Sequence, residues 1–284
     1  MDIEQYLKRI GIPGRPQPTL DSLRAIHRAH LLAIPYENLD VQLGRPVTIE
    51  RGPIFEKMVT RRRGGWCYEM NGLLGWALEE LGFKVTRSIG AVMREVWGEM
   101  AIRNHLVLKV ELPEGIYLAD VGFGDGPIDP VPLAEGPFVS GGFTFMITRL
   151  DDGWWRLRNH ADGGAPSFDF KLEPVDEVAL AEKCVEMQTS PLSPFTQNLF
   201  CFRHVDDGVL LLRGRIVRKL TPHGHTDRII DSADELVRFL DEECGLKMPE
   251  VASLWPKICA RHEDVLKAQQ QQSGPAPQPG RPAG

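Results

Sequence analysis

The sequence predicts an α+β fold in which helices come first, antiparallel strands follow, and the last part mixes the two. Apolar residues recur at helical spacing over residues 1–83, whereas short alternating stretches separated by turn residues occupy residues 84–190. Residues 191–268 combine hairpin and helix signals, and residues 269–284 are rich in Gln, Pro and Gly. We therefore expect a helical bundle, a central antiparallel β-barrel or sheet, an α/β part and a disordered tail.

The helical part should contain four helices. An apolar stripe near the N-terminus ends at Gly11, and Thr19 begins a second helix. A third helix follows Pro53, and a fourth begins at Cys67. Residues 34–43, between the second and third helices, are expected to be irregular.

Cys67 is the first candidate functional residue, because it lies where the pair Gly64-Gly65 gives way to a helix. Glycines allow sharp backbone geometry and close approach of a ligand, and the free N–H groups of a helix start lower the pKa of a thiol. Considered alone, however, the position is better explained by a buried core cysteine.

A hairpin is expected over residues 105–123, where two alternating runs are joined by a Pro-Glu-Gly turn. The turn length pairs Glu111 with Ile116. In that register His105 and Asp120 are diagonal neighbours on one face, with Cβ atoms about 7–8 Å apart. A one-residue slip would place them on opposite faces. Singly, they could be a histidine at a wet strand edge and a strand-end turn former.

Further strands are expected in the second part, at residues 85–91, 143–148, 154–157 and 168–172. Residues 122–142 between them are rich in Gly and Pro and predict a long loop.

In the last part, Asp207-Gly208 favours a tight turn between two strands, and a third strand is expected over residues 216–220. Ser232 should begin a helix that ends at Gly245, and a final helix is expected over residues 251–266. His223 and His225 could be a metal pair, but they have no third ligand at a usual spacing and are better explained as a solvated loop.

The residue types Cys67, His105 and Asp120 form a chemically coherent set. A thiolate attacks an acyl carbon, an imidazole takes and returns the proton, and a carboxylate orients the imidazole. Such a set predicts acyl transfer through a thioester. It does not identify the acceptor, because water, an amine or another nucleophile would serve.

Five groups of residues resemble the arylamine N-acetyltransferase family. The segment from Arg63 to Asn71 is similar to the family signature RGGxCxExN, and order and spacing agree along residues 1–267. The other matching segments are Ile34-Pro35-Tyr36-Glu37-Asn38-Leu39, Asn104-His105-Leu106, Ala119-Asp120-Val121-Gly122-Phe123-Gly124, and Ser193-Pro194-Phe195-Thr196 with Phe200-Cys201.

The resemblance implies an acetyl-CoA-dependent enzyme of xenobiotic metabolism that acetylates arylamines, arylhydrazines and arylhydroxylamines by a ping-pong route. It also implies a triad of cysteine-protease-like geometry and a C-terminal α/β lid over the cleft. By position, Cys67 would be the nucleophile, His105 the general base and acid, and Asp120 the orienting carboxylate. Acetyl-CoA would be the acetyl donor and co-substrate, with no metal.

The same resemblance implies further site residues. Tyr36 would line the acceptor pocket, Phe123 would shape it, and Phe200 is a candidate contact for substrate or coenzyme A. Glu37 would pair with Arg63 and support the cysteine motif. The role of Phe200 competes with that of a core aromatic residue in a strand.

Other functions remain open from the residues. A Cys-His-Asp acyl hydrolase, or an amide synthase with a different acyl donor, would need the same three groups. A non-catalytic small-molecule-binding module would not need all three.

The composition restricts partners and compartment. The 284 residues are 42% hydrophobic and carry a formal charge of -6 without a basic stripe, so a nucleic-acid partner is not expected. No stretch of 18 apolar residues and no signal peptide occurs, so no membrane partner is expected. Five cysteines without a CxxC pair indicate a reducing compartment, the cytoplasm. The cysteines other than Cys67 are expected to be core or surface thiols, and the oligomeric state is left open.

Overall fold

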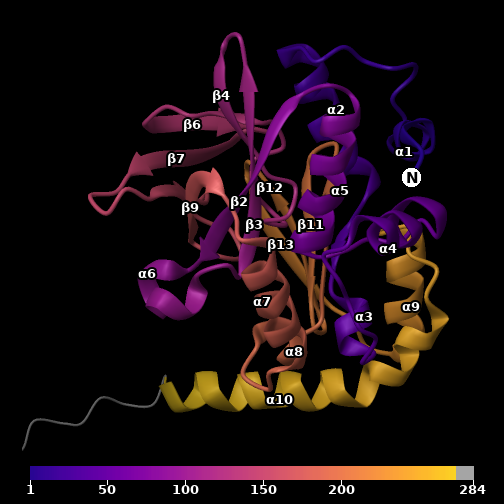
Figure 1. The fold of residues 1–284 in the computed structure, drawn as a ribbon. Coiled ribbons are helices and arrows are strands. Elements are labelled where there is room, and N and C mark those ends of the chain that lie inside the picture. The colour runs from indigo at the N-terminus through magenta and orange to yellow at the C-terminus, as the bar shows by residue number, and fades with distance from the viewer. Residues whose placement is uncertain (273–284) are drawn as a thin grey trace, which may run out of the picture.

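The computed structural model describes residues 1–272, which form an α+β fold built on two antiparallel sheets with helices packed against them (Figure 1). The larger sheet has eight strands in the order β5-β4-β3-β2-β9-β8-β7-β6, and the smaller has five in the order β1-β10-β11-β12-β13. In the described part of the chain, the edge strands β5 and β6 do not pair with each other, so the larger sheet is open.

The helices are α1 (Ile3–Ile10), α2 (Leu20–Ala33), α3 (Leu39–Gln42), α4 (Arg51–Phe55), α5 (Cys67–Glu80), α6 (Arg94–Trp97), α7 (Glu177–Thr189), α8 (Pro194–Gln197), α9 (Ala233–Glu242) and α10 (Trp255–Gln272). A π-helical turn, Glu56–Thr60, continues α4, and 3-10 turns lie at Gly98–Ala101 and Pro249–Leu254.

The strands of the larger sheet are β2 (Lys84–Val92), β3 (His105–Leu112), β4 (Gly115–Ala119), β5 (Val131–Pro132), β6 (Gly136–Ser140), β7 (Phe143–Arg149), β8 (Trp155–Arg158) and β9 (Ser167–Pro174). Those of the smaller sheet are β1 (Tyr36–Glu37), β10 (Phe200–Val205), β11 (Gly208–Arg213), β12 (Ile216–Thr221) and β13 (Gly224–Ile229).

Helix α1 ends and helix α2 begins at the residues that the sequence predicts. Gly11 ends α1 in the left-handed conformation, with φ of 78°, which glycine adopts without the clash that a Cβ would cause. The Thr19 side chain caps α2 by accepting a hydrogen bond from Ser22 N. Both predicted boundaries are confirmed.

The β3–β4 hairpin has the predicted register. Glu111 pairs with Ile116, and the ladder runs back to Leu108 opposite Ala119, where it ends. Asp120 is thus the first residue beyond the ladder, free of strand pairing and able to turn toward a neighbouring element.

Both faces of β3 are buried, although the alternation predicted only one core-facing side. Leu106, Leu108 and Val110 join the core beneath the helices, whereas Val107 packs into a second core of the larger sheet. His105, on the side of Val107, is consequently 1% exposed and does not lie at a wet edge.

Two segments expected to be irregular contain strands. Residues 34–43 form β1 and α3, and β1 pairs with β10 of the smaller sheet. Residues 122–142 contain β5 and β6, and β6 pairs along its length with β7. Strand β1 has two residues and is too short to show an alternating pattern. Strand β6 begins with a Gly-Pro pair, which disfavours a strand.

Three further differences lie nearer the C-terminus. Helix α7 was not predicted, although its buried Leu180, Cys184 and Met187 recur at helical spacing. His225 lies in β13 and not in a solvated loop. Residues 269–272 belong to α10, so the expected disorder is wrong for these four residues, and residues 273–284 of the expected tail lie outside the described part of the chain.

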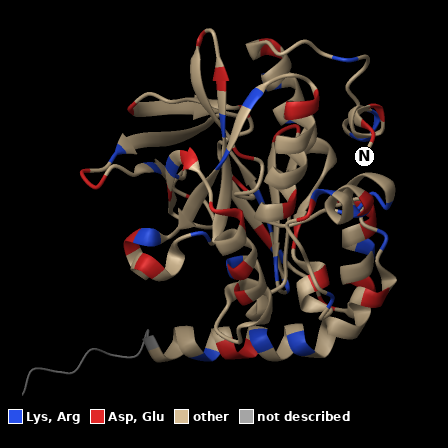
Figure 2. Ribbon diagram, in the orientation of Figure 1, with Lys and Arg blue, Asp and Glu red and all other residues tan. Residues whose placement is uncertain are grey.

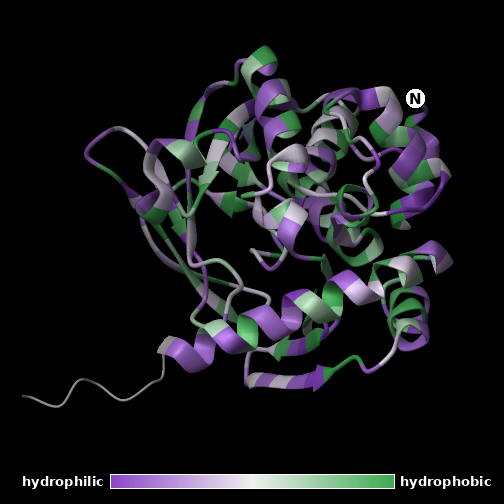
Figure 3. Ribbon diagram, turned by 90° about the horizontal axis from the view of Figure 1, so that it is seen from below, coloured by the Kyte–Doolittle hydropathy of each residue, from purple (hydrophilic) through white to green (hydrophobic). Residues whose placement is uncertain are grey.

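The helical part does not have a core of its own. The largest cluster of buried apolar side chains combines α1, α2 and α5 with the inner face of β3 and with α7. A second cluster joins the smaller sheet to α9 and the start of α10. Apolar and polar residues are interspersed along α10 (Figure 3). Basic and acidic residues are mixed over the surface elements (Figure 2). The start of α5 is therefore enclosed by elements from every part of the chain.

Candidate active site

The chain before Cys67 is shaped to admit β1. A Cβ at Gly64 would lie 2.2 Å from Pro35 O, and Gly65 exchanges backbone hydrogen bonds with Pro35 O (3.3 Å) and Glu37 N (2.9 Å). Gly64 thus leaves room for the backbone that leads into β1, and Gly65 leaves room for the Glu69 side chain, which a Cβ would approach to 2.8 Å. Cys67 begins α5 as predicted.

His105 and Asp120 meet at the end of the hairpin. Asp120 Oδ2 lies 2.7 Å from His105 Nε2, while Oδ1 accepts from Asn71 Nδ2 (2.7 Å) and Gly122 N (2.8 Å). Burial alone would raise the pKa of Asp120, but His105 and these hydrogen bonds outweigh it and hold that pKa below its ordinary value. The lowered pKa favours an ionised Asp120 carboxylate, which is hydrogen-bonded to the imidazole of His105.

The Cys67 thiol lies beside the start of β3. Its Sγ is 3.6 Å from the carbonyl oxygen of Asn104, the residue before His105, and Cys67 is 2% exposed. Burial raises the pKa of the Cys67 thiol well above its ordinary value, the charge of Asp120 adds to this, and the N–H of Tyr68 opposes it. The predicted lowering of the thiol pKa by the helix start is therefore wrong, because desolvation is the larger effect.

Gly122 allows the hairpin to lie directly against α5, and Gly90 of β2 leaves room for the His105 side chain. A Cβ at Gly122 would be 2.8 Å from Cys67 Cα and 2.6 Å from Asn71 Nδ2, and one at Gly90 would be 2.8 Å from His105 Cδ2. Any side chain at Gly122 would push the nucleophile candidate and the hairpin apart.

Aromatic rings enclose the imidazole. The Phe123 ring lies 6.2 Å from that of His105 in an edge-on arrangement, and Phe168 lies 5.1 Å from His105 and 4.8 Å from Phe123. The structure therefore brings Phe123 next to the triad candidates. Phe168, which sequence reasoning missed, completes this wall from β9.

A second aromatic group lies on the side of β1. Tyr36 bridges to Gly65 and stacks on Phe202 of β10 at 5.6 Å. The Phe200 ring instead contacts those of Phe195 and Phe202, and no ring contact joins it to His105 within residues 1–272. Phe202, two residues away, is thus the β10 aromatic residue that contacts Tyr36.

Five charged side chains form a buried cluster on the other side of the helix start. Glu37 pairs with Arg63 at 2.8 Å, and Asp40 lies 3.2 Å from Arg63 and 3.0 Å from Lys57. Lys57 also lies 2.9 Å from Glu69. Burial raises the pKa of Glu69 to about 7, because three carboxylates share two cations in a poorly solvated place.

Two polar residues of the site had no assigned role in the sequence. Asn71 lies one helical turn after Cys67 and donates to both Leu106 O (2.6 Å) and Asp120. Its spacing of four residues was an available signal. His27, in α2, accepts a hydrogen bond from Asp120 N (3.2 Å) and contacts Ile128 O (2.9 Å), and nothing in the sequence pattern indicates it.

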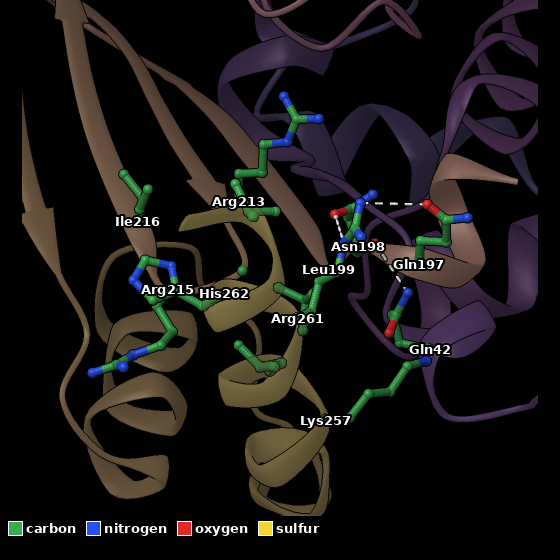
Figure 4. A pocket seen from close by; sticks show the side chains of 13 residues that line it. Gln42, Gln197, Asn198, Leu199, Arg213, Arg215, Ile216, Lys257, Arg261 and His262 are labelled. Atoms are coloured by element: carbon green, nitrogen blue, oxygen red, sulfur yellow. Dashed lines mark hydrogen bonds between the residues drawn. The ribbon is translucent and has the colours of Figure 1, made fainter. Parts of the chain in front are cut away.

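A basic pocket lies elsewhere, between α10 and the turn from β11 to β12 (Figure 4). Arg261 bonds Asn198 Oδ1 at 3.0 Å, and Lys257 extends toward Gln42. None of Cys67, His105 and Asp120 lines this pocket.

Within residues 1–272, no group of three or more His, Cys, Asp or Glu side chains is arranged to hold a metal ion. None of the helices described is both long enough and apolar enough to cross a membrane.

Comparison with known proteins agrees with this geometry. An N-acetyltransferase family model matches residues 19–252. An arylamine N-acetyltransferase of Mycolicibacterium smegmatis is 38% identical over 276 residues, covering 94% of this chain and 98% of its own. This chain belongs to the arylamine N-acetyltransferase family.

Solved structures of the family share the fold. The arylamine N-acetyltransferase of Mycobacterium marinum in complex with CoA superposes with a TM-score of 0.82 at 31% identity, covering 93% of this chain and 99% of that one. The enzyme of Escherichia coli K12 is 29% identical over 86% of this chain and 88% of its own. The protein is therefore an acyltransferase, as the sequence predicted.

Proposed function

We propose that the protein transfers an acetyl group from acetyl-CoA to aromatic amines and hydrazines through an acetylated Cys67. The observation that carries this proposal is the His105–Asp120 hydrogen bond at 2.7 Å, together with the position of Cys67 Sγ at 3.6 Å from the carbonyl oxygen of Asn104, the residue before His105. The names of the relatives support the donor and the acceptor class.

In the first half-reaction, His105 takes the proton of Cys67. Because burial raises the pKa of the thiol, the thiolate forms by transfer to His105 and not by loss to water. The sulfur bonds to the acetyl carbon, the bond from that carbon to the sulfur of coenzyme A breaks, and His105 returns the proton to the departing thiolate. The N–H of Tyr68, in the first turn of α5, can stabilise the oxyanion.

In the second half-reaction, the amine nitrogen bonds to the acetyl carbon while His105 accepts the amine proton. The bond to Cys67 then breaks and restores the thiol. Exchange between thioesters is nearly balanced in free energy, whereas formation of an amide from a thioester is downhill. The acceptor step therefore drives turnover.

The aromatic side chains account for the acceptor class. Phe123 packs edge-on to His105, and Tyr36 of β1 is supported by stacking on Phe202. Rings of this kind favour offset or edge-on contact with an aryl group. We propose that Phe200 supports these aromatic side chains through its contact with Phe202.

The five cysteines are free, which fits a reducing compartment, and we place the protein in the cytoplasm. The proposed acyl transfer by the three residues needs no metal ion, and we propose none.

Intact-mass measurement tests the proposal. Incubation with acetyl-CoA alone should give one acetyl group, and peptide mapping should locate it on Cys67. The matched control is Cys184→Ser, because Cys184 is equally buried, at 1% exposed, but lies in α7. Cys67→Ser should lose the adduct and Cys184→Ser should keep it.

Coenzyme A release distinguishes the alternatives. Release that depends on an arylamine supports transfer, whereas equal release without an amine identifies an acyl hydrolase. Adducts only from other acyl donors would identify an amide synthase. Ligand stabilisation without any adduct would identify a binding module.

A further inference from the structure

One loop, residues 120–128, carries most of the contacts that build the site. Its first residue, Asp120, bonds His105, and Gly122 lies against the backbone of Cys67. Phe123 follows and packs edge-on to His105. A small shift of this loop would therefore move the orienting carboxylate, the nucleophile contact and the aromatic wall together.

His27 holds both ends of this loop. It projects from α2, is 1% exposed, and its Nδ1 lies 2.9 Å from Ile128 O, while its Nε2 lies 3.2 Å from Asp120 N. One imidazole thus links two backbone groups that are eight residues apart in the chain.

The two partners determine the protonation of His27. The carbonyl of Ile128 can only accept, so Nδ1 carries the hydrogen, and the amide of Asp120 can only donate, so Nε2 is bare. The ring is therefore neutral. An imidazolium would set an N–H of His27 against the N–H of Asp120 and break the link.

We propose that His27 is a positioning residue for the acetyl transfer, which holds the loop so that Asp120 can orient His105. The inference rests on the function proposed above. Burial lowers the pKa of His27, which favours the neutral form. The titratable groups that face it are Asp120 and Asp129, which favour its charged form, and His30 and His204, whose own pKa values are also lowered by burial.

The neighbouring residue shows that the role is specific. Arg28, also in α2, forms a bidentate pair with Asp129 at 2.9 and 3.0 Å and so holds only the exit of the loop. His27 alone, of these two, reaches the Asp120 end. Removing the contact to Asp120 should consequently affect the reaction more than removing the contact at the exit.

Two substitutions separate the contacts of His27. In His27→Asn, the amide can replace Nδ1 and bond Ile128 O, but it cannot reach Asp120 N. In His27→Gln, the longer side chain can bring its oxygen to the position of Nε2 and keep the contact to Asp120. The matched control is His30→Asn, because His30 lies one turn further along α2, is fully buried and bonds Tyr6 instead.

The measurements are the single-turnover rate of Cys67 acetylation, kcat and KM with an arylamine, and the pH profile of Cys67 alkylation by iodoacetamide, read by peptide mass. His27→Asn should lower the acetylation rate and kcat about 10- to 100-fold with KM nearly unchanged, since misplaced groups cost rate more than binding. It should also move the alkylation profile. His27→Gln should recover most of the rate, and His30→Asn should keep it.

Other outcomes reject the inference. If His27→Asn acetylates Cys67 as fast as the unchanged protein, or if His30→Asn slows it equally, His27 has only a structural role. If the unchanged protein forms no adduct, the proposed function fails, and the alkylation profile still decides whether His27 acts on the thiol through His105. Thermal unfolding verifies that each variant is folded. If His27→Asn does not fold, His27→Gln decides: an alkylation profile that differs from that of the unchanged protein rejects the inference.

Discussion

Two buried polar networks flank the start of α5, and they are built on different principles. On the hairpin side, Asp120 is surrounded by neutral donors from Asn71 and from the backbone, with His105 and His27 beside it. On the β1 side, five charged side chains pair with one another. In the hairpin network a proton can move between groups without leaving a buried charge unpaired. In the charge cluster, loss of any one side chain leaves an opposite charge without its partner.

The difference separates chemistry from architecture. A buried ion pair is strongly destabilised by loss of one partner, because the other charge is left without compensation. A hydrogen-bonded carboxylate that faces an imidazole can change partners during a reaction at much smaller cost. We therefore expect substitutions in the hairpin network to change rate, and those in the charge cluster to change stability.

The largest effect is expected for Asp120→Asn. The amide oxygen can still accept from Asn71 and Gly122, but its NH₂ would face His105 Nε2 and reverse the tautomer, so that Nδ1 no longer accepts the thiol proton. The kcat should fall about 10³- to 10⁴-fold with a small change in unfolding free energy. Steady-state kinetics and chemical denaturation measure the two. A variant with near-normal kcat would remove Asp120 from the mechanism.

The next largest effect should come from Arg63→Met. It removes the ion-pair partner of Glu37, which is 0% exposed and keeps a hydrogen bond from the Leu39 N–H, and should cost about 3–5 kcal/mol of stability. Glu37→Gln should cost less, because Arg63 keeps its contact with Asp40. Chemical denaturation of both variants checks the order, and unchanged unfolding midpoints would show that the cluster does not stabilise the fold.

The buried histidines His30 and His204, which lie outside both networks, and Glu69 of the charge cluster should respond to pH with opposite sign. Burial lowers the pKa of His30 to about 3 and that of His204 to about 4, so the unfolded chain binds more protons below about pH 6.5, and stability falls as the pH drops. Glu69 acts the other way. Because burial raises its pKa to about 7, the folded protein retains a proton that the unfolded chain releases, and stability falls as the pH rises from about 4.5 to 7.

The variant His30→Asn isolates the histidine contribution. Between about pH 6 and 4, the unchanged protein should lose about 1.4 kcal/mol per pH unit more than the variant does. Urea denaturation at several pH values measures this difference. Parallel pH dependence in the two proteins would mean that His30 is not buried in its neutral form.

The smallest effect is expected for Arg61→Gln. Arg61 pairs with Glu56 at 3.1 Å, but the two side chains are 70% and 49% exposed, so loss of the pair should cost less than about 1 kcal/mol. Arg61→Gln and Arg63→Met each remove one ion pair, at positions two residues apart. The difference between their losses of unfolding free energy shows whether burial, and not charge pairing as such, makes the cluster stabilising.

The sequence predicted most of what depends on local pattern. The caps of α1 and α2, the start of α5 and the register of the β3–β4 hairpin follow from residue types a few positions apart. That register places His105 and Asp120 side by side, and with Cys67 at a helix start it indicates the chemistry. The ion pair of Glu37 and Arg63 came from family resemblance, since no spacing rule links residues on two separate segments.

What the sequence did not predict depends on contacts between distant segments. Strand β1 exists because β10 pairs with it, and two residues show no periodicity of their own. The position of Phe202 rather than Phe200 against Tyr36 follows from the same pairing. The raised pKa of Cys67 and the role of His27 likewise follow from burial by other elements, which a helix-start rule does not include.

The short strand β1 has a consequence for how the chain can be divided. Through Tyr36 and Glu37 it pairs with β10, and through Gly65 it is bonded to the segment that carries the nucleophile candidate. A fragment that ends before β10 would retain all three triad residues and yet lose the strand that holds this segment in place. The proposed triad therefore depends on β10, in the last third of the chain, for the support of the segment that carries Cys67.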